Sequence, residues 1–252
     1  MPHIQSAIIL AAGMSTRLRA VFGEKPKGFL PLGGNPIVER SINLLRSHGI
    51  QQIIIVTGYL SSFYEALQSK YSGVQTVYNP FYAESGSMYS LWCARQWVQA
   101  PFLLLESDLI YEQRALQTLL ATPLENAILT SGFTYSGDEI YVGATDMPLQ
   151  LTGLSKKPQV LHNIVGELVG ISKISTLLWQ AMIAYSEDYF SRHGLRLDYE
   201  EGTLHHLAGK MPVFVCKVDD LLWAEIDDAT HLRRVQESVW PQIALREGEG
   251  AG

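Results

Sequence analysis

A short segment near the N-terminus combines small residues with two positive charges. The apolar run Ile8-Ile9-Leu10 leads into Ala11-Ala12-Gly13-Met14-Ser15-Thr16, and the cations Arg17 and Lys27 follow. Small side chains let backbone N–H groups approach a polyanion closely, and consecutive amides in a tight turn form an anion-binding concavity. The spacing matches neither the P-loop nor the Gly-x-Gly-x-x-Gly dinucleotide turn. We expect the segment to hold a nucleoside triphosphate, with Arg17 and Lys27 beside the phosphates and with binding contacts from Leu10, Ala12, Gly13, Met14, Ser15 and Thr16.

Two carboxylates stand where a metal ion could be held. Glu106-Ser107-Asp108 closes the apolar run 102–105, so a carboxylate is delivered to the end of a strand. Further along, period-2 alternation puts Glu225 and Asp227 on one face, and Asp228 fits the cap of a final helix. Hard carboxylates suit Mg²⁺ and its triphosphate. Acids that only end strands or cap helices are the alternative.

Hydroxyl and acidic groups supply further candidates. Serines in the segment 78–92 open a predicted helix and can hydrogen-bond a base and a ribose, although Ser87 could simply cap the helix. On a helix, Asp198 and Glu201 are neighbours, and such like charges repel unless a cation joins them. A ligand bearing an ammonium would be that cation, while a solvated acidic face is the alternative. The candidates are Ser85, Ser87 and Ser90 for the nucleotide, and Asp138, Glu139, Asp198, Tyr199 and Glu200 for the second ligand.

The elements that must position these residues alternate between strand and helix. This β-α alternation predicts an α/β fold with a doubly wound, mixed and mostly parallel sheet flanked by helices. Ligands of such sheets bind beyond the carboxyl ends of strands, so Gly13, Asp108 and the loop 79–86 can converge. Strands are predicted near 5–11, 52–57, 74–78, 101–106 and 126–131, and helices near 36–48, 61–70, 87–99 and 112–121.

The pattern changes near residue 137. Short extended stretches predict a small antiparallel extension of the sheet. We expect one domain over 1–244, with a nucleotide-binding half (1–132) and an acceptor-binding half (133–244). Residues 245–252 have linker composition and are expected to form a flexible tail, a link to a second enzyme domain or a cloning remnant. The later elements are extended stretches at 139–144, 149–153, 164–173 and 212–217, and helices near 175–192, 199–208 and 228–243.

Composition narrows the functional classes. The 252 residues are 47% hydrophobic and 17% charged, which is typical of an ordinary globular protein. A net charge of −6 without a basic, aromatic-interleaved run argues against a nucleic-acid partner. No segment has the length of a membrane span and the start lacks signal-peptide features, so we expect a cytoplasmic protein without membrane attachment. Cys93 and Cys216 lack metal-ligand spacing, and the seven histidines form no evident cluster.

The N-terminal segment resembles the Leu-Ala-Ala-Gly-x-Gly-x-Arg-Leu…Pro-Lys signature of nucleotidyltransferases that activate phosphorylated small molecules. Within this family, the segment 78–92 and Glu-Ile-Asp at 225–227 resemble the 2-aminoethylphosphonate and phosphocholine cytidylyltransferases. The resemblance extends from Ile8 to about Val235. Ser15 is a departure, because the family usually has glycine there. The fold implied is the Rossmann-type fold of nucleotide-diphospho-sugar transferases.

The resemblance also implies a reaction and a set of roles. An acceptor oxygen would attack the α-phosphorus of CTP in line, and pyrophosphate would leave. Mg²⁺ would be held by Asp108 and Asp227. The cationic roles would be Arg17 on the leaving phosphates, Lys27 on the α-phosphate, and Lys156, or alternatively Lys157, on the acceptor anion.

The acceptor is predicted from the charges expected around it. A quaternary ammonium binds through an aromatic cage, and the phosphocholine branch has a tryptophan where this chain has Asp138-Glu139-Ile140. A primary ammonium prefers carboxylates, so we expect 2-aminoethylphosphonate, with phosphocholine second and sugar or inositol phosphates as further alternatives. A non-catalytic nucleotide-sensing module is the alternative of another class, although such a module needs no second metal ligand. A homodimer is also left open.

Overall fold

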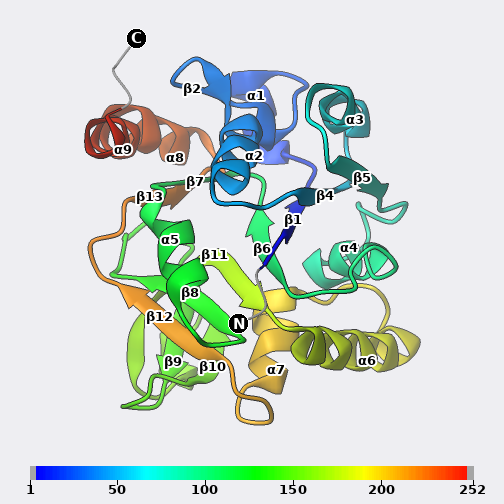
Figure 1. Ribbon diagram of the computed structural model, residues 1–252, viewed down its shortest axis with the longest axis vertical. Coiled ribbons are helices and arrows are strands. Elements are labelled where there is room, and N and C mark those ends of the chain that lie inside the picture. Colours follow the sequence, from blue (N-terminus) through cyan, green and yellow to red (C-terminus); the bar gives the residue numbers. More distant parts are fainter. Residues whose placement is uncertain (1–3, 249–252) are drawn as a thin grey trace.

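The centre of the protein is a nine-stranded mixed sheet (Figure 1). The computed structural model describes residues 4–248. The main strand order is β10-β9-β11-β6-β1-β4-β5, while β8 pairs with β11 and β12. The pairs β1–β4, β1–β6, β4–β5 and β8–β12 are parallel, and β11 is antiparallel to its neighbours. The strands are β1 (Ser6–Ala11), β4 (Gln52–Thr57), β5 (Val74–Tyr78), β6 (Phe102–Glu106), β8 (Ala127–Ser131), β9 (Tyr141–Ala144), β10 (Leu151–Ser155), β11 (Ile164–Ile174) and β12 (Phe214–Val218).

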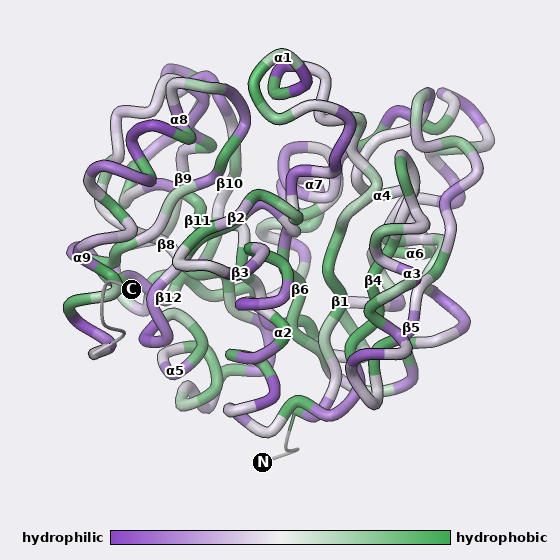
Figure 2. The backbone as a smooth tube through the Cα atoms, turned by 90° about the horizontal axis from the view of Figure 1, so that it is seen from above, coloured by the Kyte–Doolittle hydropathy of each residue, from purple (hydrophilic) through white to green (hydrophobic). Residues whose placement is uncertain are grey.

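Helices cover both faces of the sheet because alternate strand residues point to opposite sides. In β1, Ile9 belongs to one hydrophobic core, while Ile8 and Leu10 belong to the other. The first core includes side chains of α2 (Ile37–Ser47), α3 (Ser61–Lys70) and α5 (Arg114–Ala121). The second includes side chains of α4 (Ser87–Cys93), α6 (Thr176–His193) and α7 (His205–Leu207). Figure 2 shows that the central strands between these layers are largely hydrophobic.

A third, smaller core joins the two ends of the described chain. There, α8 (Ala229–Arg234), a π-helical segment (Val235–Val239) and α9 (Trp240–Glu247) pack near the hairpin of β2 (Pro31–Leu32) and β3 (Asn35–Pro36). A Cβ atom at Gly33 would lie 2.2 Å from the Trp240 ring, so this turn requires glycine. The C-terminal helices therefore support the segment that follows Lys27.

The predicted fold class is confirmed, and most long elements lie within a few residues of their predicted bounds. The predicted helix 87–99 is wrong beyond Cys93, because Ala94, Arg95 and Trp97 form tighter i→i−3 bonds. Residues 245–247, expected in the tail, belong to α9, and 249–252 lie outside the described residues. Within 4–248, no helix is both long and apolar enough to cross a membrane. Unpredicted elements are the antiparallel pair β2–β3, the antiparallel pair β7 (Leu109–Tyr111) and β13 (Trp223–Glu225), α1 (Arg19–Phe22), and 3₁₀ turns at Thr16–Leu18, Lys27–Phe29 and Pro158–Val160.

Candidate active site

A cavity of about 380 Å³ opens where β1 and β6 end. Because these strands are parallel neighbours, their carboxyl ends meet at one edge of the sheet. The acidic segment after α6 reaches the same edge through backbone bonds from Gly86 and Met88 to Leu195 and Leu197. The cavity thus gathers most of the predicted site residues, namely Leu10, Ala12, Gly13, Ser15, Lys27, Ser85, Ser87, Ser90, Asp108, Lys156, Asp198, Glu200 and Asp227.

Five predicted site residues do not line this cavity. Met14, Thr16 and Arg17 are exposed beside it, and the Arg17 guanidinium still lies 3.1 Å from an Asp227 oxygen. Tyr199 is completely buried beneath the cavity, so it supports the site rather than facing a ligand. The Glu139 carboxylate instead accepts a hydrogen bond from the Gly137 backbone.

Of the neighbouring candidates Asp138 and Glu139, only Asp138 faces the cavity. It lines the cavity together with Ile140, whereas Glu139 turns back onto its own loop. Lys156 lines the cavity and Lys157 does not, and the Lys156 backbone N–H donates to Glu201 at 2.7 Å. The structure therefore favours Lys156 over its neighbour as the cation nearest a bound ligand.

The structure shows how a serine is accommodated at position 15, where the resembling family usually has glycine. Its backbone is left-handed (φ 53°, ψ 29°), a conformation that glycine adopts without the steric cost of a side chain. The Ser15 hydroxyl accepts a hydrogen bond from the Lys27 backbone N–H at 3.1 Å. The side chain thus ties the loop that follows β1 to the segment that carries Lys27.

Lys27 lies between two aspartates. Its ammonium donates to Asp108 Oδ2 at 2.9 Å and also to Asp227 Oδ1. Burial alone would lower the pKa of Lys27, but the charges of both aspartates raise it. Burial would raise the pKa of Asp227, yet the Lys27 charge and hydrogen bond outweigh burial and bring that pKa to about 2. At neutral pH the centre therefore contains a charged Lys27 ammonium bound to a charged Asp227 carboxylate.

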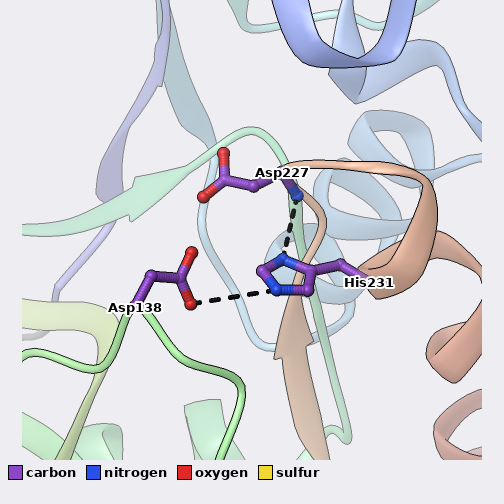
Figure 3. Close-up of side chains that lie close together, drawn as sticks. All are labelled: Asp138, Asp227 and His231. Atoms are coloured by element: carbon purple, nitrogen blue, oxygen red, sulfur yellow. Dashed lines mark hydrogen bonds and ion pairs between the residues drawn. The ribbon is translucent and has the colours of Figure 1, made fainter.

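Two groups of potential metal ligands flank Lys27. One consists of Glu106, Asp108 and Glu225, whose ligand atoms lie within 4.8 Å of one another. The other consists of Asp227 with Asp138 and His231, shown in Figure 3. The all-oxygen group fits the hard ligands that Mg²⁺ prefers. Asp108 and Asp227, predicted as a pair, belong to different groups.

The floor of the cavity holds three acids: the buried Glu200, which was predicted to bind the second ligand, and the half-buried Glu106 and Glu225, which were not predicted to bind. Burial, followed by the charge of Glu200, raises the pKa of Glu106. Burial raises the pKa of Glu200 to about 7, and burial with nearby carboxylates raises that of Glu225. Tyr199 donates to Glu106 Oε1 at 2.9 Å and holds it in place. The sequence offered one signal for Glu106: it lies two residues before Asp108, so in a strand both side chains point to the same face.

The predicted serines are held by internal hydrogen bonds at the cavity wall. The fully buried amide of Asn79 donates to Ser85 at 3.0 Å and to Ser90 at 2.9 Å. Ser87 donates to Glu200 at 3.1 Å, which links the loop to the acidic floor. Asn79 was missed as a site residue because a strand-end asparagine is indistinguishable in sequence from an ordinary turn residue.

Glu167 lies in a smaller cavity of about 30 Å³ that shares Glu106, Asp138 and Glu225 with the main cavity. Its side chain is 2% exposed and accepts two hydrogen bonds from Thr134. Burial raises the pKa of Glu167 to about 7. In the folded state it therefore keeps a proton that the unfolded chain releases.

Glu167→Gln is expected to make stability less dependent on pH. The contribution of wild-type Glu167 is fully present below about pH 4.5 and is lost as pH rises through about 7. Urea unfolding at pH 5, 6, 7 and 8 should therefore show wild type losing stability relative to the variant. A constant difference between the two proteins across this range would contradict the raised pKa.

The chain resembles known nucleotidyltransferases in sequence and in structure. The family model described as MobA-like NTP transferase domain matches residues 7–142. A choline-phosphate cytidylyltransferase of Streptococcus pneumoniae is 41% identical over 90 residues, covering 36% of this chain and 39% of that protein. A 2-aminoethylphosphonate cytidylyltransferase of Lancefieldella rimae is 33% identical over 106 residues, covering 42% and 43%. The matches to these two curated relatives span less than half of their length.

The solved structure of the inositol-1-phosphate CTP transferase from T. maritima shares the fold. It superimposes with a TM-score of 0.80 over 96% of this chain and 97% of that chain, at 19% identity. The family match also coincides with the half of the chain that carries the loop after β1, Lys27 and Asp108. This protein therefore belongs to the family of MobA-like NTP transferase domains.

Proposed function

We propose that this protein transfers a cytidylyl group from CTP to 2-aminoethylphosphonate, forming CMP-2-aminoethylphosphonate and pyrophosphate. The observation that carries the proposal is the cavity that joins the loop after β1 to an acidic floor made of Glu106, Glu200 and Glu225. The loop suits a triphosphate, and the acids suit an acceptor with an ammonium group. The relatives named for phosphocholine and 2-aminoethylphosphonate support cytidylyl transfer to a small phosphate or phosphonate.

The rate would come from positioning and charge neutralisation, because in-line transfer asks for little covalent chemistry from the protein. Backbone groups from Ala12 to Ser15 and the Arg17 guanidinium would hold the β- and γ-phosphates. Lys27 would stabilise charge at the α-phosphate, and Lys156 would hold the phosphonate. Asp108 and Asp227, which both accept hydrogen bonds from Lys27 in this structure, would hold Mg²⁺ once Lys27 turns to the α-phosphate, and the ion would neutralise further charge on the triphosphate.

The acceptor follows from the chemistry of the cavity wall. Ile140 lies where a quaternary ammonium would need an aromatic ring, while Asp198, Glu200 and Glu201 supply carboxylates. Phosphocholine is the second candidate, because Tyr82 also lines the cavity and offers an aromatic surface. Both acceptors require the same nucleotidyl-transfer site.

Pyrophosphate release with CTP fixed tests the acceptor directly. From 2-aminoethylphosphonate through its N-methylated forms to the trimethyl analogue, kcat/KM is expected to fall steadily. Each N–H donor removed costs a charge-assisted hydrogen bond of about 1.5–3 kcal/mol, or roughly one to two decades. Phosphocholine should be used poorly, and inositol phosphate serves as the acceptor without an ammonium.

A preference for trimethylated acceptors would replace the 2-aminoethylphosphonate assignment by phosphocholine. A preference for inositol phosphate, which has no ammonium group, would show that the acidic floor does not select the acceptor. Absence of pyrophosphate with every acceptor, despite CTP binding, would favour a nucleotide-sensing module instead.

A further inference from the structure

His231 connects two segments that line the cavity (Figure 3). Its Nδ1 atom accepts a hydrogen bond from the Asp227 backbone N–H at 3.4 Å. Its Nε2 atom lies 3.4 Å from the Ser136 carbonyl oxygen and 4.0 Å from Asp138 Oδ1. Because a carbonyl oxygen only accepts, both hydrogen bonds form together only when the ring carries its proton on Nε2.

The backbone of His231 is itself held in place. Asp228 begins α8 as its cap, and its carboxylate accepts the backbone N–H groups of Thr230 at 2.8 Å and His231 at 2.9 Å. The imidazole therefore projects from a fixed helix start and is 7% exposed. Because the ring is fixed, its contact with the Asp227 backbone can hold the Ser136 carbonyl at a set distance from Asp227.

The loop that receives the ring has little regular structure of its own. It connects β8 to β9 and includes Gly137 with φ 101°. The Ser136 hydroxyl donates to Asp138 Oδ1 at 3.0 Å. The residue whose carbonyl oxygen the ring contacts therefore also orients the Asp138 carboxylate. Asp138 in turn lines the cavity near Ile140 and Lys156.

We propose that His231 is a positioning residue that holds the Ser136–Asp138 loop so that Asp138 faces a bound acceptor. Given the proposed function, this sets affinity for the ammonium-bearing substrate. His231 touches neither the phosphate-binding loop nor the acidic floor through a described hydrogen bond other than that to Asp227. Its effect should therefore appear in acceptor binding more than in CTP binding.

Two substitutions separate the contacts of the ring. His231→Asn keeps an acceptor near Nδ1 for the Asp227 N–H but removes the Nε2 donor to the loop. Its acceptor KM is expected to rise about five- to tenfold, the effect of losing one hydrogen bond, with kcat and the CTP KM within about twofold. His231→Gln keeps a donor near Nε2 and should restore most of the acceptor affinity.

A double-mutant cycle tests whether the effect passes through Asp138. Asp138→Asn should raise the acceptor KM, and adding His231→Asn should raise it no further. His193→Asn, at the exposed end of α6, is the control for loss of a histidine. The proposal would be overturned if the acceptor KM of the double mutant rose by the product of the two single-mutant fold-changes. It would also be overturned if His231→Asn raised the CTP KM and left the acceptor KM unchanged.

Calorimetry separates this proposal from the proposed function. Titration of 2-aminoethylphosphonate into protein bearing a non-hydrolysable CTP analogue should show about five- to tenfold weaker binding in His231→Asn than in wild type. Weaker binding without pyrophosphate release in wild type would contradict only the proposed catalysis. Equal binding by wild type and variant, or no binding to either, would overturn the role of His231.

Discussion

Replacement of Lys27 by alanine is expected to lower kcat about 10²- to 10³-fold, the effect of removing one preorganised group from a developing charge. Lys27 is the buried ammonium between Asp108 and Asp227, and its proposed partner in the reaction is the α-phosphate. Steady-state pyrophosphate release measures the effect. Lys25→Ala is the matched control, since Lys25 is exposed and the one described contact of its side chain is with the Phe22 ring.

Loss of Lys27 also leaves two carboxylates without their shared cation, which could destabilise the fold. Lys27→Arg keeps the charge but replaces a compact ammonium by a planar fork, so it should fold and remain slow. Thermal unfolding followed by circular dichroism distinguishes a folded, inactive variant from an unfolded one. Folded Lys27→Ala with near-normal kcat would contradict the assigned role.

Asp227→Asn is expected to reduce activity about 100-fold or more and to raise the Mg²⁺ concentration needed for half-maximal rate. The substitution keeps the shape of the side chain but removes a carboxylate whose pKa is about 2 and which holds both Lys27 and Arg17. Asp108→Asn should have a similar effect from the other side of Lys27. Pyrophosphate release across a Mg²⁺ titration measures both quantities.

Asp228→Asn is the matched control because the neighbouring residue caps α8 and asparagine also caps helices well. Its activity should stay within about twofold of wild type. If Asp227→Asn and Asp108→Asn retain full activity, or if wild type works in excess chelator, the metal-binding role of these aspartates is wrong.

Local patterns were sufficient for several long elements of the nucleotide-binding half. The observed bounds of β4, β5 and α3 equal the predicted ranges, because apolar alternation and helical spacing are set by neighbouring residues. The three-residue strand β7 was missed because so short a segment carries little periodic signal, and the alternation at Glu225 and Asp227 did not reveal that β13 pairs with it. Their pairing brings Glu225 beside the chain that follows Asp108.

The sequence by itself predicted the loop of small residues at 11–16 as a phosphate site, the cations Arg17 and Lys27, and the two aspartates 108 and 227 as strand-end acids. Residue type and spacing along one segment are enough for these. Only the tertiary structure decided that Lys27 lies between the two aspartates and that Asp138 rather than Glu139 faces the cavity. It also decided that His231 joins Asp227 to the Ser136–Asp138 loop. The physical reason is that a loop side chain takes its direction from partners far away in the chain.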